Sequence, residues 1–103
     1  MNKTTGEERG TLLLKGSLGW GNVDALRRQL LDHIGAMAGS PEPVRVDLSG
    51  VPDLDTAAIQ VLISARRTVA QAGKQLQCVA ANERVRDRFR LTGTEFLLEP
   101  LAT

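Results

Sequence analysis

The chain has 103 residues and a formal net charge of +1, with 42% hydrophobic and 24% charged residues. This length and composition suit one globular domain and are too small for two. A charge near zero supplies no general field for nucleic acid or an anionic membrane. No apolar run approaches the ~20 residues that span a bilayer. The single cysteine, Cys78, excludes an internal disulfide and a thiol metal cluster.

The polar N-terminus MNKTTGEERG lacks the apolar core of a signal peptide. We therefore expect a cytoplasmic protein, folded as one domain over residues 1–103, that does not insert into a membrane and binds no nucleic acid, cofactor or metal. Residues 1–9 are expected to be partly disordered or to form an edge strand.

The first half of the chain predicts a strand, a loop and a helix. The apolar run at residues 11–15 reads as a strand, and three glycines in residues 16–22 predict a loop. Over residues 23–38 apolar side chains recur every three or four positions, as on one face of a helix. The segment GSPEP at 39–43 ends that helix.

The second half continues the alternation. The predicted elements are a strand at 44–48, a loop at 49–54, a helix from Asp55 to Ala72, a strand at 75–80, a helix from Asn82 through Leu91, and a short edge strand at 96–98. Asp55 and Asn82 suit the N-cap positions of their helices. This order predicts an α/β fold: a small, mostly parallel β-sheet with crossover helices.

The central helix is predicted to have two apolar faces. At about 100° per residue, one stripe should face the sheet; it consists of Ala58, Val61, Leu62, Ala65, Val69 and Ala72. Ile59, Ile63 and Ala70 form a second strip, and Thr56 lies near its outer edge. Either a neighbouring helix covers this second strip, or it is an exposed docking surface.

Loops that leave the carboxyl ends of parallel strands gather at one edge of a sheet, so Trp20 and Thr56 should share a rim. Trp20 could pack on the first helix or anchor an interface. Thr56 would be the first residue of its helix if Asp55 is the cap. A phosphate there would be tolerated by the helix end, whereas Asp53 and Asp55 would repel it and its charge would spoil an apolar docking surface. The alternative is that Thr56 serves helix capping alone.

Residues 44–63, VRVDLSGVPDLDTAAIQVLI, resemble the signature of STAS domains, the family of anti-sigma-factor antagonists. The segment LLLKGSLGWGNVDALRRQL is similar to the family's early strand, turn and first helix, and VRDRFRLTG to its last helix. The resemblance implies a STAS-like fold in which Thr56 accepts phosphate from a partner kinase. Ala57 and Ala58 depart from the family pattern, which has Ser or Thr and then Gly.

The resemblance implies a non-enzymatic bacterial signalling module whose partner is an anti-sigma factor or serine-kinase-like regulator of transcription. The expected partner-binding residues are Asp53, Asp55, Thr56, Ile59, Gln60, Ile63 and Trp20. A second hypothesis is a constitutive STAS subunit of a bacterial lipid-transport ABC complex, in contact with its ATPase subunit. Chemotaxis and two-component accessory STAS proteins are also similar. A third hypothesis is a small nucleotide-binding α/β protein, suggested by the glycines of 16–22.

Other conspicuous residues receive structural interpretations. His33 has no partner at metal-ligand spacing and is expected to be solvated. Cys78 is expected to be a small buried hydrophobe in mid-strand. Leu91 is expected to point inward with Val85 and Phe89. The arginines of the third helix are expected to form a solvated face, with binding of an acidic partner as the alternative.

Overall fold

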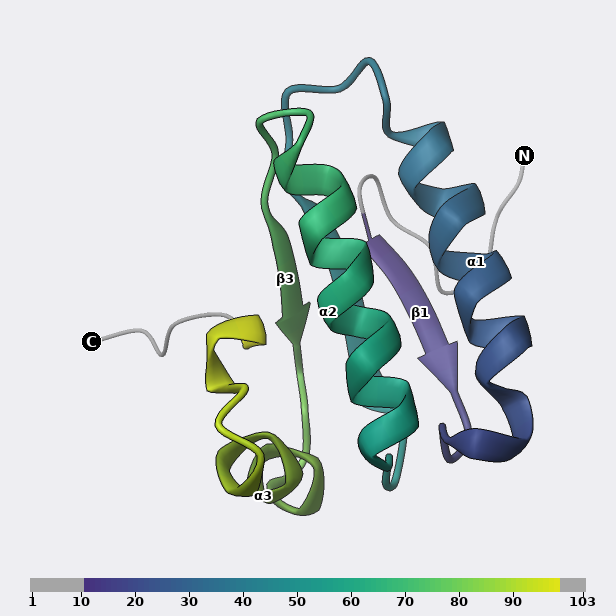
Figure 1. Cartoon of the computed structure of the whole chain (residues 1–103), viewed down its shortest axis with the longest axis vertical. Helices are drawn as coiled ribbons and strands as arrows, with labels where there is room; N and C mark the ends of the chain where they lie inside the picture. Colours follow the sequence, from purple (N-terminus) through teal and green to yellow (C-terminus); the bar gives the residue numbers. More distant parts are fainter. Residues whose placement is uncertain (1–10, 99–103) are drawn as a thin grey trace.

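The computed structural model describes residues 11–98, which alternate between strand and helix (Figure 1). The residues of the expected N-terminal disorder or edge strand, 1–9, lie outside this range. The elements are β1 (Thr11–Lys15), the 3₁₀ turn η1 (Trp20–Asn22), α1 (Val23–Ala36), β2 (Val44–Gly50), α2 (Thr56–Ala70), β3 (Leu76–Val79), α3 (Glu83–Leu91) and the 3₁₀ turn η2 (Glu95–Leu97).

The three strands form a parallel sheet in the order β1-β2-β3, with α1 and α2 as the crossovers. Thr11 lies opposite Arg45, and Val44 lies opposite Leu76. Successive right-handed crossovers in one direction place their helices on the same face of a sheet, and Figure 1 shows α1 and α2 side by side over that face. The predicted fold class, α/β with a parallel sheet and crossover helices, is confirmed.

The core lies between the sheet and the two crossover helices. Val44, Val46 and Leu48 of β2 are completely buried, whereas the alternate residue Arg45 is exposed and donates to the Gln77 side chain on the opposite face. From α2 the core receives the predicted stripe: Ala58, Val61, Leu62, Ala65 and Val69. The periodicities of 2 and 3.6 therefore fix which sides of β2 and α2 face each other.

Ala72 does not belong to that stripe. The helix α2 ends at Ala70 and Gln71 is its C-cap, so Ala72 lies in the following turn and is exposed. Gly73 there has a φ of 76°, a left-handed conformation that ends helices and favours glycine. The predicted helix end was two residues too late.

Two expectations for side chains on the outer helices are wrong. His33 is only 8% exposed, because it continues the inner face that Leu26 and Leu30 begin seven and three residues earlier. Leu91, by contrast, is 81% exposed as the last residue of α3. Val85 and Phe89 of α3 are buried as expected.

The segment predicted as a final edge strand is mainly the 3₁₀ turn η2. Only Leu98 pairs with the sheet, through one isolated parallel bridge to Cys78. Phe96 is half exposed, and Leu97 provides the buried side chain of this turn. None of the helices between residues 11 and 98 combines the length and apolar character needed to cross a membrane.

Cys78 is expected to be inert to thiol reagents in the native protein. Its side chain is fully buried, and burial raises the pKa of its thiol to about 12, so almost no thiolate is present at neutral pH. Reaction with a disulfide reagent, followed by absorbance, should be negligible in buffer and stoichiometric in guanidinium chloride. Rapid native labelling that is absent from a Cys78→Ser variant would contradict the buried position.

Candidate functional site

The loops that follow β1 and β2 lie beside each other at the end of the sheet where α2 and α3 begin (Figure 1). Leu18 and Leu54 form a parallel bridge. The Leu18 amide donates to the Asp53 carbonyl over 3.1 Å, and the Asp55 amide donates to the Leu18 carbonyl over 3.0 Å. We call the surface formed by residues 17–22, 52–56 and Arg88 the rim. The expectation that Trp20 and Thr56 share one edge of the sheet is met.

The Asp55 carboxylate connects both loops of the rim. Its Oδ1 accepts from the Ala58 amide over 3.2 Å, which is the N-cap bond of α2, and its Oδ2 accepts from the Trp20 amide over 3.1 Å. Hydrogen bonds from backbone amides, with that of Trp20 the strongest, lower the pKa of Asp55 below its ordinary value. This carboxylate is therefore ionised at neutral pH while it fixes the start of α2.

Gly19 is required for this contact. A Cβ on Gly19 would lie 2.4 Å from Asp55 Oδ2, well inside van der Waals contact. The φ of Gly19 is 178°, an extended conformation open to any residue, so the need is for space and not for backbone freedom. The Asn22 side chain completes the turn by accepting from the Gly19 amide over 2.8 Å and donating to the Ser17 carbonyl over 2.9 Å.

Asp53 ties the same loop to α3. Arg88 donates to its two carboxylate oxygens through Nε at 2.9 Å and Nη2 at 3.0 Å, in the two-point geometry that suits guanidinium and carboxylate. The bond from Arg88 lowers the pKa of Asp53 below its ordinary value. Asn82 also holds the loop, because its side-chain amide donates to the Val51 and Pro52 carbonyls over 3.3 Å.

Sequence reasoning did not anticipate the Asp53–Arg88 pair. It treated the arginines of α3 as one solvated face, yet Arg88 binds Asp53 and Arg84 Nη1 lies 3.9 Å from the same carboxylate. The two partners are 35 residues apart, so no helical spacing could reveal the pairing.

Thr56 is exposed as the first residue of α2, directly after its cap. Trp20 is 81% exposed, so it is not packed on α1. A shallow hollow of about 560 Å³ lies between the two loops, with Trp20, Asp53, Asp55 and Arg88 among its walls. The rim thus presents the Thr56 hydroxyl, the Trp20 indole and the carboxylates of Asp53 and Asp55.

Of the two alternatives for the second strip of α2, the exposed docking surface is ruled out for Ile59. Ile59 is 2% exposed and belongs to the core cluster, so it is withdrawn as a partner-binding residue. Ile63 is half buried against the core, whereas Gln60 and Ala70 are exposed. Of the α2 residues expected to bind a partner, Thr56 and Gln60 are therefore accessible, and Ile63 is partly so.

The rim is poorly suited to a nucleotide phosphate. Gly19 and Trp20 share their hollow with the carboxylates of Asp53 and Asp55, whose lowered pKa values keep them ionised and which would repel an anion. Within residues 11–98 no three His, Cys, Asp or Glu side chains gather in a way that could hold a metal ion. The rim therefore gives no support to the nucleotide-binding hypothesis.

Replacement of Gly19 by Ala should lower the free energy of unfolding by ~1–3 kcal/mol, because the new methyl group collides with the Asp55 carboxylate. Gly21→Ala is the matched control: a Cβ there meets nothing within 4 Å. Urea denaturation followed by circular dichroism measures both variants. Equal stability of the two variants would show that the close approach of Gly19 to Asp55 is not required.

The stability provided by Asp55 should be present above about pH 4 and lost as the pH falls through its lowered native pKa. The difference in unfolding free energy between wild type and Asp55→Asn should therefore shrink on acidification. Asp32→Asn, which removes an exposed carboxylate on α1, is the control variant. Urea denaturation from neutral pH to about pH 2.5 measures this. A difference in unfolding free energy between wild type and Asp55→Asn that does not change with pH would contradict the hydrogen bonds that the Asp55 carboxylate accepts.

Comparisons with known proteins agree with this architecture. A structure from Thermotoga maritima, described as an anti-sigma factor antagonist, superposes with a TM-score of 0.72 at 18% identity and covers 91% of this chain and 80% of that one. The murine Solute Carrier 26 family member A9 anion transporter, in its inward-facing state, matches with a TM-score of 0.74 at 20% identity over 84% of this chain but only 14% of its own. At these identities the likeness concerns the fold.

No curated protein sequence matches the chain. The family described as "Mlab, STAS domain" matches residues 1–99, which is nearly the whole length. The parallel sheet, the crossover helices and this match agree: the chain belongs to the STAS domain family.

Proposed function

We propose that this STAS domain is a regulatory module that docks to a kinase-type regulatory protein through its rim and is switched by phosphorylation of Thr56. The observation that carries the proposal is the position of Thr56: an exposed hydroxyl on the first residue of α2, directly after the Asp55 cap. An exposed tryptophan lies on the neighbouring loop, and Trp is enriched among residues that dominate binding energy.

A phosphate on Thr56 would change the surface more than the fold. The side chain is exposed, so the group needs no space inside the protein, and the positive end of the α2 dipole tolerates an anion. It would add nearly two negative charges beside the ionised carboxylates of Asp53 and Asp55. A partner surface complementary to the unmodified rim would then meet a strongly anionic one and dissociate.

The second candidate function is a constitutive subunit of a lipid-transport ABC complex, in which Thr56 contacts an ATPase subunit without modification. Ala57 and Ala58 favour this candidate, because they stand where the phosphorylated STAS proteins that the sequence resembles have Ser or Thr and then Gly. The rim would be the contact surface in both cases, and the two candidates differ in whether Thr56 is modified.

Thr56→Glu is expected to abolish binding of the proteins that copurify with the wild type, while the thermal unfolding midpoint stays within a few degrees. Ser64→Glu is the matched control, since it adds the same charge at an exposed position two turns further along α2, outside the rim and outside the expected partner-binding residues. Retention of the partner by Thr56→Glu at wild-type yield would refute docking at this residue.

Intact mass of protein isolated from cells separates the two candidates. Phosphorylation adds about 80 Da, and the addition should be absent from a Thr56→Ala variant. A single unmodified mass in cells, together with loss of partner binding by Thr56→Glu, would support the constitutive subunit instead.

A further inference from the structure

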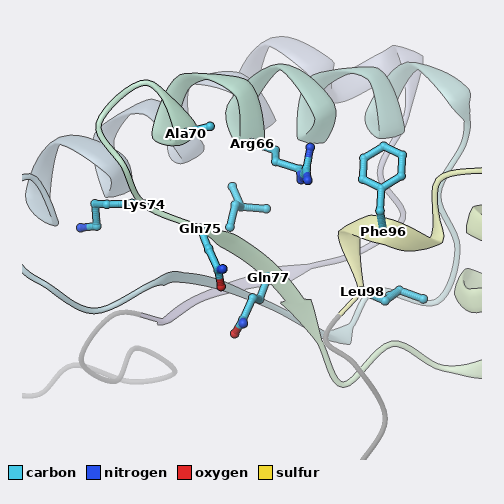
Figure 2. Close-up of a pocket in the computed structure, with 8 residues that line it drawn as sticks. Arg66, Ala70, Lys74, Gln75, Gln77, Phe96 and Leu98 are labelled. Atoms are coloured by element: carbon cyan, nitrogen blue, oxygen red, sulfur yellow. The ribbon is translucent and has the colours of Figure 1, made fainter.

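A groove of about 380 Å³ runs along the outer edge of β3, away from the rim (Figure 2). Arg66 and Ala70 of α2 form one wall, Phe96 and Leu98 form the other, and residues 74–77 form the floor. No residue is common to this groove and to the hollow at the rim. The groove is therefore a second surface, and its role is independent of the function proposed for Thr56.

On the outer edge of β3, within this groove, the backbone groups of Leu76 have no strand partner among residues 11–98. The Val44 amide of β2 donates to the Gln75 carbonyl over 2.8 Å, so Gln75 and Gln77 direct their backbone groups toward β2. Because these groups alternate along a strand, Leu76 and Cys78 direct theirs to the outer edge. Cys78 is bridged there by Leu98, whereas no residue between 11 and 98 pairs with Leu76 on that side. In Figure 1 no helix or strand lies on the outer side of the first half of β3, whereas η2 lies beside its second half.

An unpaired edge within reach of a hydrophobic wall is a place where an extended peptide can add as a strand. The groove supplies such a wall through Phe96, which is 51% exposed, and Leu98. The Arg66 guanidinium lies 4.8 Å from the centre of the Phe96 ring and holds it at the mouth of the groove. Leu76 is 4% exposed and lies at the bottom of the groove, so an incoming strand would reach its backbone groups past Phe96, which supplies the apolar contact.

The charges around the groove indicate which kind of segment it can bind. Arg66 and Lys74 are its two ionic side chains, Gln75 and Gln77 are neutral, and no carboxylate lines it. The Lys74 Nζ donates to the Met37 carbonyl over 2.5 Å, which fixes the cation at one end of the groove without neutralising it. A second copy of this edge would bring the same two cations against these, so self-pairing is disfavoured.

We propose that the outer edge of β3 binds an extended acidic segment of a partner protein, which adds to the sheet as a strand beside Leu76. One apolar side chain of the segment rests on Phe96 and Leu98, and its carboxylates lie toward Arg66 and Lys74. The open stretch, residues 74–77, spans about 13 Å at ~3.3 Å per residue, so the motif is short. A short motif gives a weak and reversible contact.

The probe is a short synthetic peptide with Val and Glu two residues apart and Thr between them, so that both side chains lie on the strand face toward Phe96 and Arg66. It is tested with the full chain by fluorescence anisotropy and by hydrogen exchange at the Leu76 amide. Binding should saturate and should slow exchange of that amide. The matched peptide with Lys in place of Glu should not bind, because it repeats the charge of the groove. A version N-methylated on the amides that would pair with β3 should also fail, since it keeps the carboxylates but loses the strand bonds.

On the protein side, Arg66→Glu should weaken binding of the Glu–Val peptide by at least about tenfold. Arg67→Glu is the control, because Arg67 is exposed on the next position of α2 and does not line the groove. If Arg66→Glu fails to fold, the proposal is still tested by comparing how the Glu–Val peptide and its N-methylated version bind to the wild type. Absence of binding, equal binding of the N-methylated peptide, or concentration-dependent protection of Leu76 without peptide would each overturn the proposal.

Discussion

One carboxylate, that of Asp55, determines the geometry of the surface through which this domain is proposed to act. A helix begins with backbone amides that lack intrahelical partners, and a side-chain oxygen at the N-cap satisfies one of them. Asp55 does this for α2 with one oxygen and uses the other for the Trp20 amide of a different loop. The backbone of Trp20 and the start of the helix are thereby held together.

The remainder of the rim reinforces that junction. Asp53 binds Arg88 of α3, Asn82 holds the carbonyls that precede Asp53, and Gly19 leaves room for the Asp55 carboxylate. Exposed ion pairs of this kind contribute little stability singly. Their effect here is positional, because three loops that leave the sheet separately are joined into one surface. A partner that meets this surface need not order it, and such preorganisation reduces the entropic cost of binding.

Local patterns in the sequence were sufficient for most of the fold. The strands were predicted from short apolar segments and the helices from apolar side chains that recur every three or four positions, and Asp55 and Asn82 were identified as caps from residue type and position. The errors arose where distant packing decides. Ile59 was expected on a surface strip, but tertiary contacts cover it, and His33 occupies an inward position that its polarity concealed. The Asp53–Arg88 pair joins segments that only the folded chain brings together.

The position of Trp20 has a spectroscopic consequence. It is the one tryptophan of the chain and is 81% exposed, so its indole is almost as hydrated in the folded state as in the unfolded one. Intrinsic emission at the red, water-like wavelength is therefore the native signature of this domain. The same fluorophore reports poorly on global unfolding, whereas any macromolecule that covers the rim transfers it to an apolar medium and shifts its emission to the blue.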